Sequence, residues 1–158
     1  MAKKIVIYNF QTAKQDWFTD LKNLYIKKIK PFLAIEIITL KTINVDRDDW
    51  QKKINFEQNE FLQKIEDSDF FILLDQNGKN FNSESFAQSI ENQINYGKKR
   101  IVFLIGGAYG VTETIKKKAD LKIKLSDFVL NHLIAESLLL EQIYRSLTII
   151  NRIPYHNN

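Results

Sequence analysis

Residues 100–111, with the sequence RIVFLIGGAYGV, decide the fold of this chain. They contain five consecutive apolar residues at 101–105, which are followed by Gly106, Gly107 and Gly110. An uninterrupted apolar run that ends in glycine predicts a strand buried on both faces. Ligands of open α/β sheets bind outside the carboxyl ends of such strands. We therefore expect a ligand beside these glycines, which allow positive φ and a close approach of the backbone.

The three glycines are spaced G-G-x-x-G and occur late in the chain. This spacing differs from the G-x-G-x-x-G of a first βα turn, which argues against a Rossmann dinucleotide site. The alternative to a ligand-binding loop is a tight turn that needs glycine for its backbone conformation.

The composition indicates one globular domain without a metal centre. The chain has 158 residues, no cysteine and two histidines, His132 and His156. This length suffices for one sizeable core but is short for two. The absence of cysteine excludes disulfides and thiolate metal sites, and two histidines are too few for a histidine-rich centre. We therefore predict no metal.

The net charge of +4 is compatible with an anionic partner such as nucleic acid. The alternative is a mildly basic surface that binds no polyanion. The N-terminal segment MAKKIVIYNF has too short an apolar run for a signal peptide, and no segment is long enough to span a bilayer. We expect a cytoplasmic protein with no membrane partner.

Strands and helices are predicted to alternate along the chain. Branched apolar runs indicate strands, and apolar residues at helical spacing indicate helices. The predicted strands are residues 3–8, 33–40, 69–75, 101–105 and 121–125, and the predicted helices are residues 16–30, 46–67, 83–96, 111–119 and 132–150. This order predicts a single α/β domain with a mostly parallel sheet flanked by helices.

Local signals suggest where several elements begin or end. Asp46 or Asp48 is expected to cap the second helix, and Ser83 the third. Asn77 and Gly78 are expected to form a positive-φ turn directly after the strand at 69–75.

The last helix is apolar on nearly all sides over residues 133–150. Such a helix is buried on several sides. In a domain this small, the expected cover is a second subunit, most simply in a twofold dimer. The alternative is burial within one subunit.

Glu141 and Arg145 have the order and spacing of a helical ion pair. Alternatively, Arg145 faces a site and reaches phosphate or a base.

A set of short motifs follows in the C-terminal third. They are residues 103–110 (FLIGGAYG), Leu125-Ser126, His132, residues 140–145 (LEQIYR) and Pro154-Tyr155-His156. In order and spacing, this set resembles the RlmH family, SPOUT-class methyltransferases that act on large-subunit ribosomal RNA. Upstream, the likeness rests on chain length, the strand–helix order and the Asp75…Gly78-Lys79 segment, so it covers most of the chain.

The resemblance implies a homodimer through the C-terminal helix, with a deep trefoil knot over about residues 100–158. It implies S-adenosyl-L-methionine as co-substrate. The implied reaction is methylation at N3 of a pseudouridine in helix 69 of 23S ribosomal RNA, within the assembled 70S ribosome.

The resemblance also implies site residues. The cofactor pocket would comprise Leu74, Gly78, Gly106, Gly107, Leu125, Ser126, Asp127, Phe128, Val129 and Leu130. His132, Arg145, Tyr155 and His156 would form the catalytic and RNA-binding part. Arg145 would supply electrostatic stabilisation or a phosphate contact, Tyr155 would stack on RNA, and His156 would handle a proton or bind phosphate. The alternatives are a helix-terminal role for His132 and a disordered tail.

Some residues depart from the usual family pattern. Asn9-Phe10 stands where the family usually has Gly-Lys, Asn131 replaces a usual Pro or Ser, and Glu136 replaces a basic residue. The charge reversal at Glu136 motivates a second hypothesis, a catalytically weakened knotted dimer that binds RNA or a nucleotide. A methyltransferase for another RNA, such as tRNA, is a third. The basic residues 98–100 and 116–118 would either contact phosphate or form a solvated surface.

Overall fold

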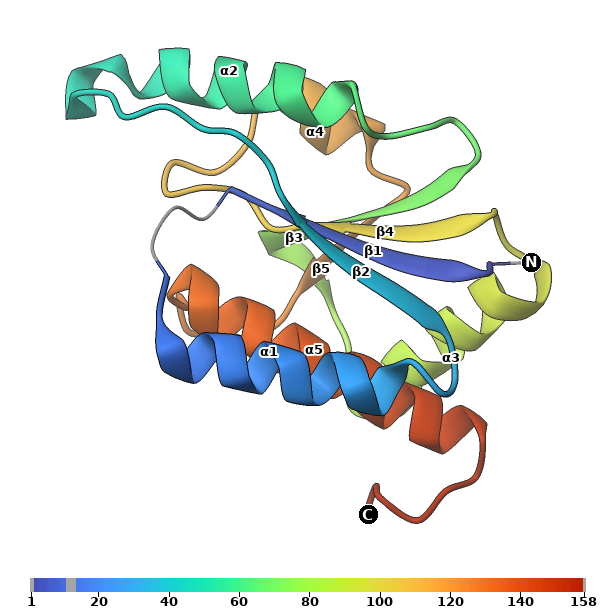
Figure 1. Ribbon diagram of the computed structural model, residues 1–158. Helices are drawn as coiled ribbons and strands as arrows, with labels where there is room; N and C mark the ends of the chain where they lie inside the picture. Colours follow the sequence, from blue (N-terminus) through green and yellow to red (C-terminus); the bar gives the residue numbers. More distant parts are fainter. Residues whose placement is uncertain (1, 11–13, 158) are drawn as a thin grey trace.

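The computed structural model describes residues 2–10 and 14–157 and is built around a parallel five-stranded sheet (Figure 1). The strand order is β2-β1-β4-β3-β5. The strands are β1 (Lys4–Asn9), β2 (Ala34–Thr39), β3 (Asp69–Asn80), β4 (Arg100–Leu104) and β5 (Leu121–Lys124). The helices are α1 (Asp16–Ile29), the 3₁₀ helix η1 (Arg47–Asp49), α2 (Trp50–Leu62), α3 (Ser83–Tyr96), α4 (Glu113–Lys118) and α5 (His132–Ile150). The predicted α/β class, with a parallel sheet flanked by helices, is confirmed.

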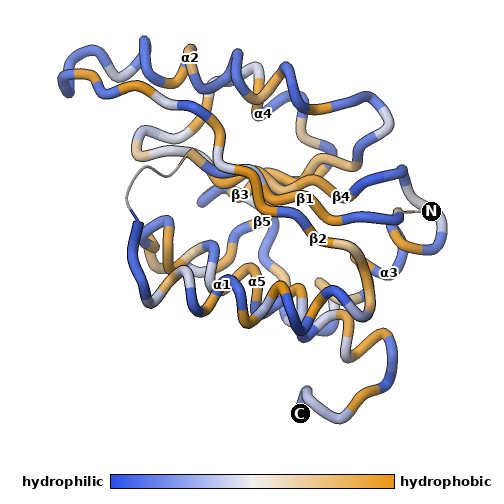
Figure 2. The backbone as a smooth tube through the Cα atoms, in the orientation of Figure 1, coloured by the Kyte–Doolittle hydropathy of each residue, from blue (hydrophilic) through white to orange (hydrophobic). Residues whose placement is uncertain are grey.

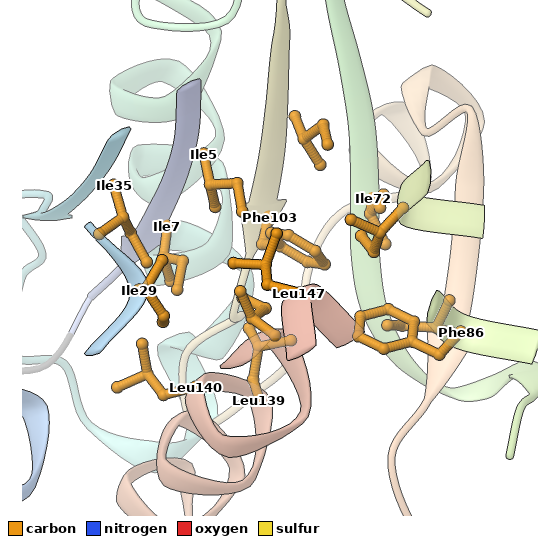
Figure 3. Close-up of a cluster of buried hydrophobic side chains, with 14 of the residues drawn as sticks. Ile5, Ile7, Ile29, Ile35, Ile72, Phe86, Phe103, Leu139, Leu140 and Leu147 are labelled. Atoms are coloured by element: carbon orange, nitrogen blue, oxygen red, sulfur yellow. The ribbon is translucent and has the colours of Figure 1, made fainter. Parts of the chain in front are cut away.

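The sheet separates two hydrophobic cores. Successive strand residues point to opposite faces, so Ile101 and Phe103 pack against α1, α3 and α5, while Val102 and Leu104 pack against α2 and α4. Figure 3 shows the first core, in which Phe103 lies among side chains from the helices and neighbouring strands. In Figure 2 the sheet is a hydrophobic layer between helices that each carry hydrophilic residues as well.

The central position of β4 confirms the interpretation of the 100–111 stretch. β4 pairs in parallel with β1 on one side and β3 on the other. Its residues Ile101, Val102 and Phe103 have no exposed surface. A strand covered on both faces and both edges explains why its sequence is apolar throughout rather than alternating.

The turn predicted at residues 76–79 is wrong, because β3 continues through this segment to Asn80. The pairing of β3 with β5 shifts register between Leu74 and Lys79, so an irregularity replaces the turn. Gly78 does not have positive φ. Its backbone lies so close to Ile123 that a Cβ atom would approach the Ile123 backbone to 2.6–2.8 Å. Here glycine is needed for the close approach of two strands.

The starts of two helices differ from the predictions. α2 follows η1 and has Asp49 at its N-cap position, so neither Asp46 nor Asp48 caps it. Asn82 rather than Ser83 caps α3, since its side chain accepts from the backbone N–H of Ser85 at 2.8 Å. The Ser85 hydroxyl is in turn close to the backbone N–H of Asn82, which completes a capping box.

Helix α5 has the bounds predicted from the sequence. It lies beside α1 and α3 on one face of the sheet (Figure 1), and its residues Leu139, Leu140 and Ile143 are fully buried there. Much of its apolar surface is therefore covered within one subunit, whereas Ile134 is 46% exposed.

Among the described residues, no helix is long and apolar enough to cross a membrane.

Candidate functional site

Residues 106–110, here called the glycine segment, leave the sheet at the carboxyl end of β4 and fold back. The Gly110 N–H donates to the Gly107 carbonyl at 3.0 Å, and Gly110 has a φ of 78°. The tight turn considered from the sequence is thus present at Gly110. A cavity also lies beside this segment, as expected for a ligand-binding loop. The segment therefore contains a tight turn and also borders a possible ligand site.

This cavity, here called the main cavity, has a volume of about 480 Å³. That volume lies within the range typical of small-molecule sites. It lies over the carboxyl ends of β3, β4 and β5, between the glycine segment and the loop that precedes α5. The predicted residues that line it are Leu74, Gly106, Gly107, Leu125, Ser126, Val129, Leu130 and His132. The structure therefore brings together three segments that are far apart in the sequence.

Three residues predicted for the cofactor pocket do not line the main cavity. Gly78 lies against the β5 backbone instead. Asp127 pairs with Lys124 at 2.6 Å, and the Phe128 side chain is exposed. The loop still reaches β3, because the Gln76 amide donates to the Phe128 carbonyl at 3.4 Å.

Several polar lining residues were not predicted for the cofactor pocket. They are Asp75, Gln76, Tyr109 and Asn131, together with Lys116, which was considered only for phosphate contact. Asp75 and Gln76 directly follow the buried part of β3, so the rule that placed a ligand at the end of β4 also applies to them. The expectation of a turn at 76–79 concealed this signal.

A second cavity of about 180 Å³, here called the side cavity, lies on the other flank of the glycine segment. It shares residues 105–108 and His132 with the main cavity. Its remaining lining residues are Asn9, Phe10, Thr42, Lys53, Glu57 and Glu136. The two cavities are thus neighbours along the carboxyl edge of the sheet.

The side cavity contains two buried carboxyl groups, Glu57 and Glu136, which are 3% and 1% exposed. Glu57 accepts a hydrogen bond from the Thr42 hydroxyl at 2.5 Å, and Glu136 accepts from the Asn9 amide at 2.9 Å. Burial raises the pKa of both carboxyl groups, although these hydrogen bonds act in the opposite direction. Among the described residues, the Asn9 Oδ1 atom is buried without a hydrogen-bond partner.

Gly107 separates the main cavity from Glu57. A Cβ atom at this position would lie 2.8 Å from one Glu57 carboxylate oxygen and 2.9 Å from the other. Glycine therefore allows the buried carboxylate to approach the backbone of the segment that both cavities share.

The candidate residues Arg145, Tyr155 and His156 lie together at the C-terminal end, in what is here called the tail cluster. The Arg145 guanidinium binds Glu141 with contacts of 2.6 and 3.0 Å, which confirms the predicted ion pair. It also lies 4.8 Å from the centre of the Tyr155 ring and 3.2 Å from His156 Nδ1. The His156 Nε2 atom contacts Glu84 at 2.7 Å. The tail is therefore packed against its own subunit as far as His156.

The phenol of Tyr155 donates to Glu141 at 3.2 Å. Burial, together with Tyr25 and Glu141, raises the pKa of Tyr155 to about 12. Tyr155 therefore stays protonated near neutral pH and cannot act as a base there. This leaves ring stacking and hydrogen-bond donation as its available roles.

His132 and Arg145 lie near opposite ends of α5. Arg145 follows His132 by 13 positions, which correspond to about 20 Å along the helix axis. In Figure 1 the start of α5 lies near the carboxyl edge of the sheet, whereas the tail lies beyond the other end of the helix. Within one subunit, the structure brings Arg145, Tyr155 and His156 together but not with His132 or the main cavity.

Several basic residues considered for phosphate binding already have acidic partners. Arg100 contacts Asp69 at 2.6 Å, which raises the pKa of the guanidinium. Lys98 pairs with Asp120, Lys116 with Glu113 and Lys118 with Asp67.

In the described part of the chain, no cluster of three or more His, Cys, Asp or Glu residues has a metal-binding arrangement.

Comparison with known proteins gives one family. The family model described as "Predicted SPOUT methyltransferase" matches residues 3–156. A protein of Bdellovibrio bacteriovorus named Ribosomal RNA large subunit methyltransferase H is 44% identical over 154 residues, 98% of this chain and 99% of that protein. Proteins of the same name from Christiangramia forsetii and Fusobacterium nucleatum are 38% and 40% identical, over 87% and 84% of this chain and 88% and 85% of theirs.

Solved structures agree at the level of the fold. A crystal structure described as a hypothetical protein has a TM-score of 0.54 at 16% identity, over 93% of this chain and 80% of its own. A probable methylase family protein from Haemophilus influenzae has a TM-score of 0.53 at 12% identity, over 99% of this chain and 71% of its own.

Proposed function

The chain belongs to the SPOUT methyltransferase family, and we propose that it is an S-adenosylmethionine-dependent methyltransferase of large-subunit ribosomal RNA. The proposed reaction is methyl transfer to N3 of a pseudouridine in helix 69 of 23S ribosomal RNA, within the 70S ribosome. The observation that carries the proposal is the main cavity at the glycine end of β4. The names of the relatives support ribosomal RNA as the substrate.

The residues of the main cavity suit S-adenosylmethionine. Leu74, Leu125 and Leu130 provide apolar walls for an adenine ring. Asp75 provides a carboxylate that can accept hydrogen bonds from ribose hydroxyls or an ammonium group. Small-molecule sites combine apolar walls with a few placed polar groups, and the main cavity offers both. The proposal includes the trefoil knot over about residues 100–158.

A complete site would require a second copy of the chain. Arg145 and Tyr155 lie about 20 Å along α5 from the end that borders the main cavity. A twofold dimer in which the α5 helices run antiparallel would bring the tail cluster of one subunit towards the main cavity of the other. The exposed side chains of Phe128, Val129 and Ile134 near that cavity would gain cover in such a dimer.

Methyl transfer at N3 is an in-line displacement at the methyl carbon, so its main requirement is alignment. The N3 proton must also leave, and negative charge develops on the ring. In the proposed dimer, Arg145 would stabilise this charge or hold phosphate. Tyr155 would stack on RNA, and His156 would bind phosphate or accept a proton.

The alternative, a binding module without turnover, was motivated by the acidic residue at position 136. Glu136 is 1% exposed and is hydrogen-bonded to Asn9. Its carboxylate therefore lines the side cavity and forms no acidic patch on the outer surface, where the RNA backbone would bind, and this favours the enzyme.

Mapping the methylated nucleotide tests the proposal. Ribosomes from a strain that lacks the modification would be incubated with the protein and S-adenosylmethionine, and digests of the 23S RNA compared by mass spectrometry with an enzyme-free control. We expect one added methyl group in helix 69, on a pseudouridine. Methylation at another position would contradict the proposed specificity, and no methylation would contradict the activity.

A further inference from the structure

The side cavity is a recess with several polar side chains in its lining, and the assignment of the main cavity leaves it without a role. It opens beside the same glycine segment, where β1 and β4 end next to each other. It is rich in hydrogen-bond acceptors, which come from the end of β1, from α2 and from α5. Acceptors from three separate elements converge on one small volume.

We propose that the side cavity receives the target base, a uracil-type ring, and binds its ring N–H groups through Asn9, Glu57 and Glu136. This inference rests on the proposed function and identifies the part of the site that recognises the base. It concerns residues that the family resemblance did not assign to the site.

Asn9 provides the most specific indication of a ligand. It is 5% exposed and lines the cavity, and its Oδ1 atom has no hydrogen-bond partner among the described residues. Its Nδ2 atom is fixed by the bond to Glu136. Leaving a buried acceptor unpaired is unfavourable, because the desolvation of the oxygen is not compensated. A ring N–H group is the type of donor that would satisfy it.

The charges favour a base over a phosphate group. Two buried carboxyl groups would repel a phosphate, whereas they accept hydrogen bonds from a neutral N–H donor. Lys53 and His132, which also line the cavity, can donate to the ring carbonyls. The cavity therefore offers both acceptors and donors, which matches the alternating carbonyl and N–H groups of a uracil edge.

The size and position fit the same ligand. A volume of about 180 Å³ corresponds to about six water molecules, which is room for a single ring but not for a whole nucleotide. The sugar and phosphate would remain outside. Because Gly106 and Gly107 border both cavities, a ring in the side cavity would lie next to a methyl donor in the main cavity.

Nucleoside titrations monitored by amide NMR test the proposal on the full chain with bound S-adenosylhomocysteine. We expect uridine and pseudouridine to shift the amide signals of Phe10, Gly107 and Ala108. 3-Methyluridine, which lacks the N3–H donor, is expected to bind about tenfold more weakly. Equal shifts with 3-methyluridine, or shifts confined to residues outside the cavity, would overturn the proposal.

Two variants and a control test whether uridine binds in the side cavity. Glu57→Gln replaces one acceptor oxygen of the carboxylate with an NH₂ donor, and Lys53→Ala removes a donor from a half-buried position. Each is expected to weaken uridine binding about tenfold while the affinity for S-adenosylhomocysteine, measured by calorimetry, stays unchanged. Glu60→Gln, also on α2 but outside the cavity lining, is the matched control. Unchanged uridine binding in a folded Glu57→Gln or Lys53→Ala protein would contradict the assignment.

The two proposals fail separately. If ribosomes are methylated but Glu57→Gln and Lys53→Ala leave both KM and kcat unaltered, the base-binding role of the side cavity is wrong and the proposed function stands. If uridine binds in the expected pattern but ribosomes are not methylated, the cavity assignment stands and the proposed reaction is wrong.

Discussion

Asn9 donates a hydrogen bond from its side-chain amide to the Glu136 carboxylate over 2.9 Å, and so joins the end of β1 to α5. Both residues are buried. Because a buried carboxylate needs a donor and a buried amide needs an acceptor, each of these two residues satisfies the other.

A double-mutant cycle measures this coupling. Asn9→Ala leaves the Glu136 carboxylate without its donor and is expected to lower the free energy of unfolding by about 1–3 kcal/mol. Asn9→Ala combined with Glu136→Ala should cost less than the sum of the single changes, because neither partner is then left unpaired. Urea unfolding of the four proteins measures this. Additive costs, as expected for the control pair Asn9→Ala and Glu113→Ala, would contradict a direct interaction.

The raised pKa of Glu136 predicts a pH dependence of stability. Burial is the main cause of the increase. A carboxyl group with a raised pKa in the folded state favours folding below its unfolded pKa of about 4.3, and this contribution is lost as the pH rises through the folded value. Glu136→Gln removes this titration. The variant should therefore gain stability relative to the wild type as the pH rises from 4 to 8.

Urea unfolding of wild type and Glu136→Gln across that pH range provides the measurement. Glu57 titrates in both proteins, so its contribution cancels to first order in the difference. If the stability of Glu136→Gln relative to wild type does not depend on pH, or falls as the pH rises, then ionisation of Glu136 does not destabilise the fold.

Gly78→Ala is expected to destabilise the fold through the contact between β3 and β5. The new Cβ atom would come within 2.6–2.8 Å of the Ile123 backbone, which cannot move without separating the strands. A cost of about 1–3 kcal/mol is typical of such overpacking. Thermal unfolding tests this. Gly110→Ala is an informative comparison, because its Cβ meets no atom within 4 Å and only the positive φ of 78° opposes it.

Mixed dimers test whether the site is shared between subunits. Leu130→Trp fills the main cavity, and Arg145→Ala removes the guanidinium from the tail cluster. Each variant alone should be inactive. After subunit exchange, half of the dimers are mixed and each contains one intact site, so about a quarter of wild-type methyl transfer should return. Activity that does not recover, in mixtures shown to contain mixed dimers, would place all residues of a site in one subunit.

The fold was largely predictable where local sequence and tertiary environment agree. The apolar run 101–105 and the long apolar helix predicted at 132–150 led to β4 and α5 with nearly their observed bounds. The turn at 76–79 failed because pairing with β5 extended β3 through an Asn-Gly pair that favours turns.

The candidate site was predictable only in part. Leu74, Gly106 and Leu125 follow from strand ends and from the motifs of the resemblance, and the structure places them on one cavity. The side cavity was not predictable, because Asn9, Glu57 and Glu136 come from three distant elements. Their contacts depend on the tertiary arrangement, and nothing in the local sequence around each residue indicates the others.

The most direct test of the central claim is the transfer of labelled methyl from S-adenosylmethionine to 70S ribosomes that lack the modification. Wild type would be compared with Arg145→Ala, Tyr155→Ala and the surface control Glu91→Gln. We expect label in the 23S RNA with wild type and the control, and a loss of about 100-fold or more with the two tail variants. No incorporation by wild type, despite binding of S-adenosylmethionine measured by calorimetry, would contradict the enzyme and leave the binding module.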